Sequence, residues 1–508
     1  MFDLTVPLPA WQPVRGSSSN RNRFRLATMA RACAATALLA LPSSWAHAQV
    51  MWQVASGDWS VAENWAGGVP NTATSATISA GTATVNSLGA ACQLLQLGPD
   101  GNGSLQIVGG SLATVREMID GTITQTGGEH SVRDYSIFNE SHLWVGMFGT
   151  GNYNQTGGRN EVYRLVLGGN YVNTQGFYNL SDTGDLSAEF ETIGGLAGSG
   201  EFVQSGGTNT ISGYMTINTA NTGGETPSRA VYTLNSGTLT AGVGEYVGSF
   251  FFEGAGVFTQ NGGTNTTGLL SIASFAGTSG TYNLNGGTLN LTSLRKGNGT
   301  ATFNFGGGTL QALASFSTNV PMTLTGVNDD ASMDTAEHDV TFTGQLSGSG
   351  GLNKLGTGSL ILSAANTYTG DTAVLDGTLR LDSTGSLTLA IDEAGNSGIT
   401  IAAGAEVDLF GAVRLHVGNL SDSAKTWTLI NNSGTLKYEP SFALTMDDGT
   451  PFVQSNDIWV CSNGLQQWTF TEATGVLSLV TAPEPSSVVL LAISGVCLLV
   501  GARRRRFL

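Results

Sequence analysis

Between residues 101 and 310, apolar and polar residues alternate in short stretches that end at a pair of glycines. One such stretch is Tyr282, Asn283, Leu284 and Asn285, followed by Gly286 and Gly287. An alternation with a period of two places the apolar side chains on one face of a strand and the polar ones on the other. The glycines end the strand and allow positive φ at a corner. The pattern therefore predicts short strands separated by sharp turns.

The stretch recurs at a nearly constant interval. Its copies begin at Ile123, Tyr153, Tyr178, Phe202, Tyr232, Phe258, Tyr282 and Phe303, on average about 26 residues apart. Further strand patterns precede and follow many copies, so that one period accommodates three strands. Coils of three strands, stacked about 4.8 Å apart, bury a continuous core that one coil could not bury alone. We therefore expect an all-β fold in which residues 101–345 form a right-handed parallel β-helix, or β-solenoid. An array of β-sandwiches is the alternative.

Glutamine occupies the inward third position of four copies, at Gln125, Gln155, Gln204 and Gln260. One hypothesis is a ladder of amides that bond to one another down the stack. The other is that this face is open and binds sugar hydroxyls.

Residues 346–381 carry a different pattern, in which glycine-rich turns alternate with short strands. It resembles the autotransporter-associated β-strand repeat, and this resemblance implies one β-helical coil pair of a secreted passenger protein. The motif residues that carry the resemblance are Gly350, Gly351, Leu352, Lys354, Gly358, Asn366, Tyr368, Gly370 and Gly377.

The regions on either side of the repeats are less regular. Residues 49–100 contain Trp52, Trp59 and Trp65, which we expect to cover the first coil; stacking on sugar rings is the alternative. Residues 382–482 show shorter, irregular strand patterns and are expected to form a C-terminal β cap. Caps are needed because the edges of the terminal coils would otherwise pair with other chains.

Residues 1–48 are typical of a secretory signal peptide. Five arginines precede an apolar run over residues 32–41, and Ala46 and Ala48 provide the small residues that signal peptidase reads. Translation starts at Met1 or at Met29.

Residues 483–508 contain Pro483, Glu484 and Pro485, then an apolar stretch over 486–502, then Arg503, Arg504, Arg505 and Arg506. The stretch is just long enough for a transmembrane helix, and the arginines would hold its end in the cytoplasm. This order resembles the PEP-CTERM sorting signal of Gram-negative bacteria. The resemblance implies recognition of the Pro-Glu-Pro motif by an exosortase-type membrane transpeptidase. A plain membrane anchor, retained rather than cleaved, is the alternative.

Composition agrees with an exported β protein. Glycine accounts for 71 of 508 residues, too few and too irregular for collagen, and charged residues for 11%. The formal net charge is −16, and without the two terminal segments it becomes about −24 because nine arginines are lost. Such a chain repels nucleic acid, so we expect no nucleic-acid partner. Cys92 and Cys461 form either one long-range disulfide or two buried thiols.

The densest group of ionisable residues lies between positions 329 and 339. We expect a solvated turn there; a calcium site and a catalytic acid pair are the alternatives. The group consists of Asp329, Asp330, Asp334, Glu337, His338 and Asp339. The remaining histidines have no partner at metal-ligand spacing, and no hydrolase or phosphate-loop motif is present. We therefore expect no enzyme activity, no catalytic residue and no cofactor.

These observations predict an exported structural or adhesin-like β-solenoid of the cell surface or extracellular polysaccharide matrix of a Gram-negative bacterium. Its expected partners are signal peptidase, the exosortase-type enzyme and extracellular polysaccharide. The alternative is a β-helix protein that binds or degrades polysaccharide.

Overall fold

The computed structural model describes residues 48–133, 141–169, 171–195, 197–218, 228–248, 254–420, 424–463 and 466–481. The chain divides into a unit of residues 1–48 and a unit of residues 49–508, and the following concerns the second unit. The expected signal peptide, apart from Ala48, and the expected sorting signal both lie outside the described residues. Within the described residues, no helix is long and apolar enough to cross a bilayer.

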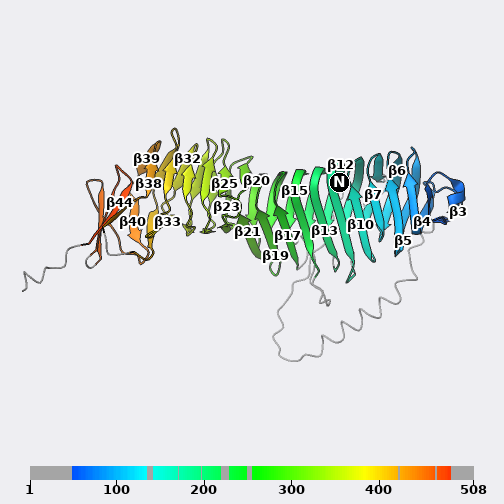
Figure 1. The fold of residues 1–508 in the computed structure, drawn as a ribbon, viewed down its shortest axis with the longest axis horizontal. Coiled ribbons are helices and arrows are strands. Elements are labelled where there is room, and N and C mark those ends of the chain that lie inside the picture. Colours follow the sequence, from blue (N-terminus) through cyan, green and yellow to red (C-terminus); the bar gives the residue numbers. More distant parts are fainter. Residues whose placement is uncertain are drawn as a thin grey trace, which may run out of the picture. The chain divides into compact units, whose positions relative to one another are not determined.

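The described residues contain almost no helix and form a parallel β-solenoid of the right-handed type with about 14 turns. Figure 1 shows its strands stacked in successive coils. Most of the strands belong to one continuous sheet that winds around the core. Its first strands are β1 (Ala48–Trp52), β2 (Ser56–Asp58), β3 (Trp65–Ala66), β4 (Thr74–Val85), β5 (Ala90–Ile107), β6 (Ser111–Ile119), β7 (Thr122–Gln125), β8 (Glu129–Val132), β9 (His142–Val145), β10 (Thr150–Gln155), β11 (Arg159–Leu167), β12 (Gln175–Ile193), β13 (Ser199–Ile211) and β14 (Tyr214–Ile217). It continues with β15 (Ala230–Ala241), β16 (Gly244–Val247), β17 (Ala255–Gln260), β18 (Thr264–Ile272), β19 (Ser279–Leu284), β20 (Thr288–Lys296), β21 (Thr300–Phe305), β22 (Thr309–Ala312), β24 (Met322–Leu324), β25 (Ala331–Asp334), β27 (Leu346–Gly348), β28 (Leu352–Leu355), β31 (Thr372–Val374), β34 (Ile399–Ile401) and β38 (Ile430–Asn432).

Three smaller sheets complete the fold. The first consists of β23 (Phe316–Thr318), β26 (Val340–Phe342), β29 (Ser359–Leu362), β32 (Thr378–Leu381), β35 (Glu406–Leu409) and β39 (Thr435–Tyr438). The second consists of β30 (Ala365–Asn366), β33 (Ser386–Ile391), β36 (Ala412–Val417) and β40 (Ala443–Met446). The third is antiparallel and consists of β37 (Lys425–Thr428), β41 (Val453–Ser455), β42 (Ile458–Asn463), β43 (Gln466–Thr471) and β44 (Val476–Thr481).

Each coil in the first half has three faces, separated by two corners and a bend. Face 1 contains β7, β10 and the start of β12; face 2 contains β8 and the first part of β11. The strand then bends near Tyr163, and face 3 contains β9 and the second part of β11. Pairing between coils is parallel and in register on all three faces, as between Tyr153 and Tyr178 on face 1. The predicted β-solenoid is confirmed.

Glycine is required where one coil lies on the next at the corner between faces 1 and 2. Gly287 has φ +71°, a conformation that residues with a Cβ rarely adopt. A Cβ at this position would also lie 2.3 Å from the carbonyl oxygen of Gly263 in the preceding coil. The paired glycines of the sequence are therefore explained by backbone contact between coils.

An aromatic column runs through the core beneath face 1. Its rings are parallel within 11°, and neighbouring centroids lie 4.6–5.3 Å apart, one ring per coil. Offset-stacked rings each contribute about 0.5–1.5 kcal/mol beyond the burial of their area. The column consists of Tyr153, Tyr178, Phe202, Tyr232, Phe258, Tyr282 and Phe303, all at most 1% exposed.

The glutamines determine which of these rings carries a hydroxyl. Gln204 is buried, and its Oε1 accepts a hydrogen bond from the Tyr232 hydroxyl of the next coil at 2.6 Å. Where a coil has leucine instead, as at Leu234, the next ring is a phenylalanine, here Phe258. The same rule pairs Gln125 with Tyr153, Gln155 with Tyr178 and Gln260 with Tyr282.

Both hypotheses for the glutamines were therefore wrong. Gln125, Gln155, Gln204 and Gln260 are 0% exposed, so they do not form an open sugar-binding face. They also do not bond to one another: each Oε1 accepts from a tyrosine hydroxyl, and each Nε2 donates to a backbone carbonyl of the next coil, as Gln125 does to Arg159 at 2.9 Å. An amide ladder does occur on the outer side of face 1, where Asn261 donates to Asn235 at 2.9 Å and Asn285 donates to Asn261 at 3.0 Å.

The N-terminal tryptophans cover the first coil, as expected. Trp52, Trp59 and Trp65 are at most 8% exposed, and the Trp65 indole donates to the Trp59 carbonyl at 2.8 Å. Antiparallel pairing of β1 with β3 and a 3₁₀ turn at Ala62–Asn64 complete this cap. The alternative of sugar stacking fails because the rings are buried.

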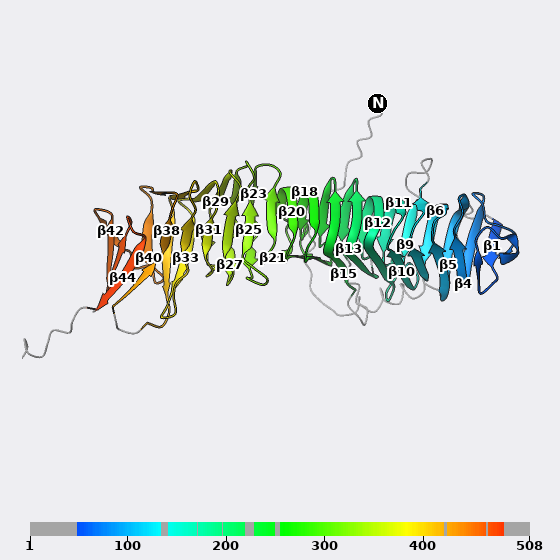
Figure 2. The same ribbon diagram turned by 45° about the horizontal axis from the view of Figure 1, so that its top comes forward.

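The C-terminal cap begins later than residue 382. Parallel coils continue through β33, β36 and β40, which end at Met446 (Figure 2). Only β37 and β41–β44 form an antiparallel sheet, which includes Trp427 and Trp468. The paired-glycine pattern ends before these last coils, but alternating apolar residues such as Leu387, Leu389 and Ile391 still form parallel strands. Cys92 and Cys461 are both buried free thiols, so the disulfide alternative is wrong.

The pairing of glutamine with tyrosine can be tested with Gln204→Leu, Tyr232→Phe and the double variant. Each single change leaves at least one buried polar group without its partner, so each should lower the free energy of unfolding by about 1–3 kcal/mol. The double variant reproduces the Leu234–Phe258 pair and should lose at least 1 kcal/mol less than the sum of the two. Thermal unfolding followed by circular dichroism gives the comparison. Strictly additive losses would show that the two side chains do not interact.

Candidate functional site

The residues of the autotransporter-type repeat build the coil and do not line a binding site. Lys354 is 0% exposed, and its Nζ donates to the carbonyl oxygens of Leu355, Gly356 and Asp376 at 2.7–3.1 Å. Burial lowers the pKa of Lys354 to about 8, although Asp376 and Asp334 oppose this shift. The ammonium group thus ties two successive coils together at a corner.

The other motif residues have similar structural roles. Asn366 accepts from the Leu346 backbone N–H at 2.9 Å, and the Tyr368 hydroxyl lies 2.7 Å from Thr372 Oγ1. Leu352 is buried in the core. A Cβ on any of four motif glycines would lie within 2.5 Å of neighbouring backbone atoms, and Gly377 has φ +63°. These four are Gly350, Gly351, Gly358 and Gly370.

Replacing Lys354 with methionine should destabilise the chain. The change keeps the buried stem but removes the ammonium donor that three carbonyl oxygens share, at a cost of about 2–4 kcal/mol. Lys296→Met removes the same charge from an exposed position and is the matched control. A lower thermal midpoint for Lys354→Met alone is expected. Equal midpoints for the two variants would contradict a structural role for the buried ammonium.

The interior also holds buried carboxyl groups, which the sequence analysis did not single out. Glu191 and Glu245 point inward from face 3 and are 0% exposed. Each accepts one hydrogen bond from an asparagine of the next coil, Asn209 at 3.3 Å and Asn265 at 3.1 Å. In both glutamate–asparagine pairs, the other carboxyl oxygen and the asparagine Oδ1 have no hydrogen-bond partner. Because a protonated carboxyl adds an O–H donor, both pairs favour the neutral form of the acid.

Burial accordingly raises the pKa of Glu191 to about 8 and that of Glu245 to about 7. Hydrogen bonds from the asparagines oppose the shift. These carboxyls are sealed inside the coil, where no substrate can reach them. Their perturbed pKa values therefore indicate buried structural groups and not catalysts.

The two carboxyls make stability depend on pH. The unfolded chain releases these protons near pH 4.5, whereas the folded chain keeps them until about pH 7–8. Their contribution to the free energy of unfolding is thus complete below about pH 4.5. It falls by a few kcal/mol as the pH rises to about 8, and above that pH it no longer changes. Glu191→Gln with Glu245→Gln should flatten this part of the stability curve, measured as thermal midpoint against pH. The exposed control Glu129→Gln should leave the slope unchanged; an equal slope in all variants would contradict the assignment.

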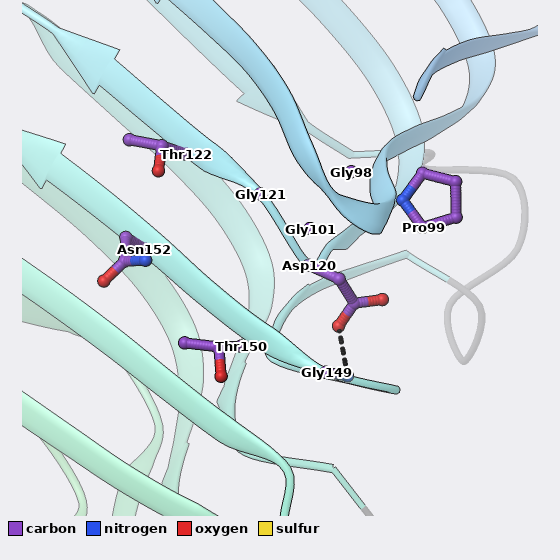
Figure 3. A pocket seen from close by; sticks show the side chains of 9 residues that line it. All are labelled: Gly98, Pro99, Gly101, Asp120, Gly121, Thr122, Gly149, Thr150 and Asn152. Carbon is purple, nitrogen blue, oxygen red and sulfur yellow. Dashed lines mark hydrogen bonds between the residues drawn. The ribbon is translucent and has the colours of Figure 1, made fainter. Parts of the chain in front are cut away.

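A surface hollow of about 480 Å³ lies where the corners of three successive coils meet (Figure 3). Its floor is glycine because the coils approach closely: a Cβ on Gly98 would lie 2.7 Å from the backbone of Gly121. Thr122, Thr150 and Asn152 supply polar side chains on face 1. The hollow is open to solvent and can accept a polar ligand.

Asp120 provides the single carboxylate among the residues that line this hollow. Its Oδ1 accepts from the backbone N–H groups of Phe148 and Gly149 at 2.9 and 2.8 Å. Burial raises the pKa of Asp120, and these bonds oppose the rise. Beside it, Phe148 and Tyr171 are 56% and 50% exposed, and their ring centroids lie 5.6 Å apart.

Hydroxyl, amide and carboxylate groups beside exposed rings form a surface suited to contact with sugars. One acid without a second acid or a base is not a hydrolytic pair. No local pattern in the sequence marks this hollow, because its residues come from three coils and because Phe148 and Tyr171 lie outside the repeated stretch.

The acidic residues near position 330 belong mainly to a turn. Asp330 accepts from the Gly351 N–H at 2.6 Å, and Asp334 accepts from the Ala336 N–H and the Gln311 side chain at 2.8 and 2.7 Å. Glu337 and His338 border a second open hollow, of about 460 Å³. Across the described ranges, no three His, Cys, Asp or Glu side chains gather as a metal site.

Two comparisons with known proteins match parts of this chain. Residues 352–381 match the family model of the passenger-associated transport repeat. A segment of 89 residues is 40% identical to the adhesin BmaC autotransporter of Brucella suis biovar 1 (strain 1330). That segment covers 18% of this chain and 2% of the adhesin. No solved structure matches the chain. The chain is therefore an all-β repeat protein that contains an autotransporter passenger repeat and is similar in part to an autotransporter adhesin.

Proposed function

We propose that this chain is an adhesin-like surface protein of a Gram-negative bacterium that acts by binding and not by catalysis. The passenger repeat over 352–381 and the partial similarity to an autotransporter adhesin support this function. A stack of coils displays outward side chains over a long surface, which suits repeated weak contacts with a polymer or a cell.

The observation that carries the proposal is where the titratable groups lie. The most strongly perturbed carboxyls, Glu191 and Glu245, are enclosed in the core, while Asp120 stands alone in its hollow. Catalysis of polysaccharide cleavage needs an acid and a base that both reach the glycosidic bond. The Asp120 hollow offers polar and aromatic contacts instead, which favours binding over degradation.

We further propose that export follows the terminal signals. Cleavage after Ala48 by signal peptidase would release the N-terminal segment, and an exosortase-type enzyme would recognise Pro483, Glu484 and Pro485. The arginines 503–506 would set the orientation of the precursor in the membrane. The chain would then reach the outer surface or the extracellular polysaccharide matrix.

The sorting step is tested by changing Pro483, Glu484 and Pro485 together to alanine. In cells that carry an exosortase-type enzyme, the wild-type chain should leave the membrane with a C-terminus near residue 485. The variant should keep Leu508 and stay with the membrane fraction. Intact mass spectrometry of both fractions distinguishes the two. A wild-type chain that still ends at Leu508 outside the cell would overturn the sorting proposal.

The adhesin function has its own readout. Cells that export the wild-type chain should adhere to polysaccharide-coated surfaces more strongly than cells of a deletion strain. The purified chain should release no new reducing ends from the same polysaccharides, because it does not cleave them. Adhesion equal to that of the deletion strain would overturn the proposal, and release of reducing ends would favour the degrading alternative.

A further inference from the structure

The outer side of face 3 differs from the outer sides of faces 1 and 2. Faces 1 and 2 present mainly threonine, asparagine and serine, as in the asparagine ladder at Asn235, Asn261 and Asn285. Each strand of face 3 points two side chains outward, which form two rows across the coils. One row includes Arg116, His142, Arg164 and Phe190, and the other includes Trp144 and Tyr246.

These side chains form a partly exposed surface of rings and guanidinium groups. The His142 ring stacks on Trp144, with centroids 4.4 Å apart and planes within 3°. The Arg164 guanidinium lies 4.9 Å from the centroid of Phe190, and Phe190 lies 4.7 Å from Tyr214. A guanidinium placed over a ring face still carries several N–H donors at its rim, which can bond to a carboxylate.

The charge of face 3 is opposite to that of the chain as a whole. From β6 to β20, neither described outward row contains an aspartate or a glutamate, although the exported chain has a net charge of about −24. The glutamates on the same strands, Glu117, Glu191 and Glu245, point into the core. Among the described residues near the bend, Glu189 is a neighbouring acid, and Glu161 on face 2 is paired with Arg133 at 2.6 Å.

The two arginines also act on His142. Burial, together with the charges of Arg164 and Arg116, lowers the pKa of His142 to about 4. The charges of the two arginines thus add to the effect of burial in disfavouring a further positive charge on this part of face 3. A bound anion would weaken the effect of these charges.

We infer that face 3 binds an extended anionic polysaccharide, with Arg116 and Arg164 contacting its carboxylates and with Trp144 and Phe190 packing against its sugar rings. This inference rests on the proposed function and specifies its ligand. Arg116 and Arg164 stand two coils apart, about 10 Å at the usual spacing of strands. That distance suits carboxylates carried on nearby sugars of one chain. The sparse arginines and the acidic remainder of the chain disfavour a polyphosphate.

The test measures binding of the full exported chain to polygalacturonate, with neutral dextran as the comparison polymer. The double variant Arg116→Gln with Arg164→Gln should bind polygalacturonate at least tenfold more weakly than the wild type. The matched control is Arg380→Gln with Arg414→Gln, which removes the same charge elsewhere. Arg380 lies 4.3 Å from the centroid of Phe410 and so reproduces the Arg164–Phe190 contact outside face 3. The affinity of the control variant for polygalacturonate should lie within twofold of that of the wild type.

A second measurement is made on the wild-type chain and does not depend on the folding of the arginine variants. Polygalacturonate should raise the pKa of His142 in the wild-type chain, followed by NMR and assigned with His142→Gln. Equal binding by the two double variants, no shift of His142, or tighter binding of dextran or single-stranded DNA would overturn the inference. If cells that export the double variant Arg116→Gln with Arg164→Gln adhere as strongly as cells that export the wild-type chain, the face 3 assignment alone is overturned. If cells that export the wild-type chain adhere no better than the deletion strain, the proposed function is overturned.

Discussion

The structure depends on the register between successive coils. Each coil buries its side chains only against the coils above and below, so a slip of one residue would turn the core side chains outward. The aromatic column and the Gln204–Tyr232 type of pair oppose such a slip. Stacking of rings favours the aligned register in every coil, and the hydrogen bonds specify which coil lies next to which.

This internal arrangement leaves the outer faces free to differ. The same backbone ladder carries asparagine and threonine on face 1 and arginine with aromatic residues on face 3. Inside, Glu191 and Glu245 are tolerated because burial keeps them close to neutrality. Function is therefore expected on the outside of the coils, where changes in side chain cost little stability, and not in the enclosed core.

The sequence was enough to predict the fold, because alternation and paired glycines are local signals. It was also enough to place Trp52, Trp59 and Trp65 in a cap. It misplaced the start of the C-terminal cap, since β33 and β36 lack the glycine pattern yet continue the coils. It misjudged the glutamines because the partner of Gln204 is a tyrosine 28 residues away, and no local rule identifies that pair. The hollow at Asp120 and the surface of face 3 escaped prediction for the same reason: both combine residues from several coils.

The central claim is that an anionic polysaccharide binds to face 3 of the stack of coils. Hydrogen exchange of the full exported chain, followed by mass spectrometry with and without polygalacturonate, tests it most directly. We predict protection confined to peptides that contain the face 3 strands β6 and β9 and the second parts of β11 and β12, with faces 1 and 2 of later coils unchanged. Protection centred on other strands, or no protection at saturating polymer, would contradict the account.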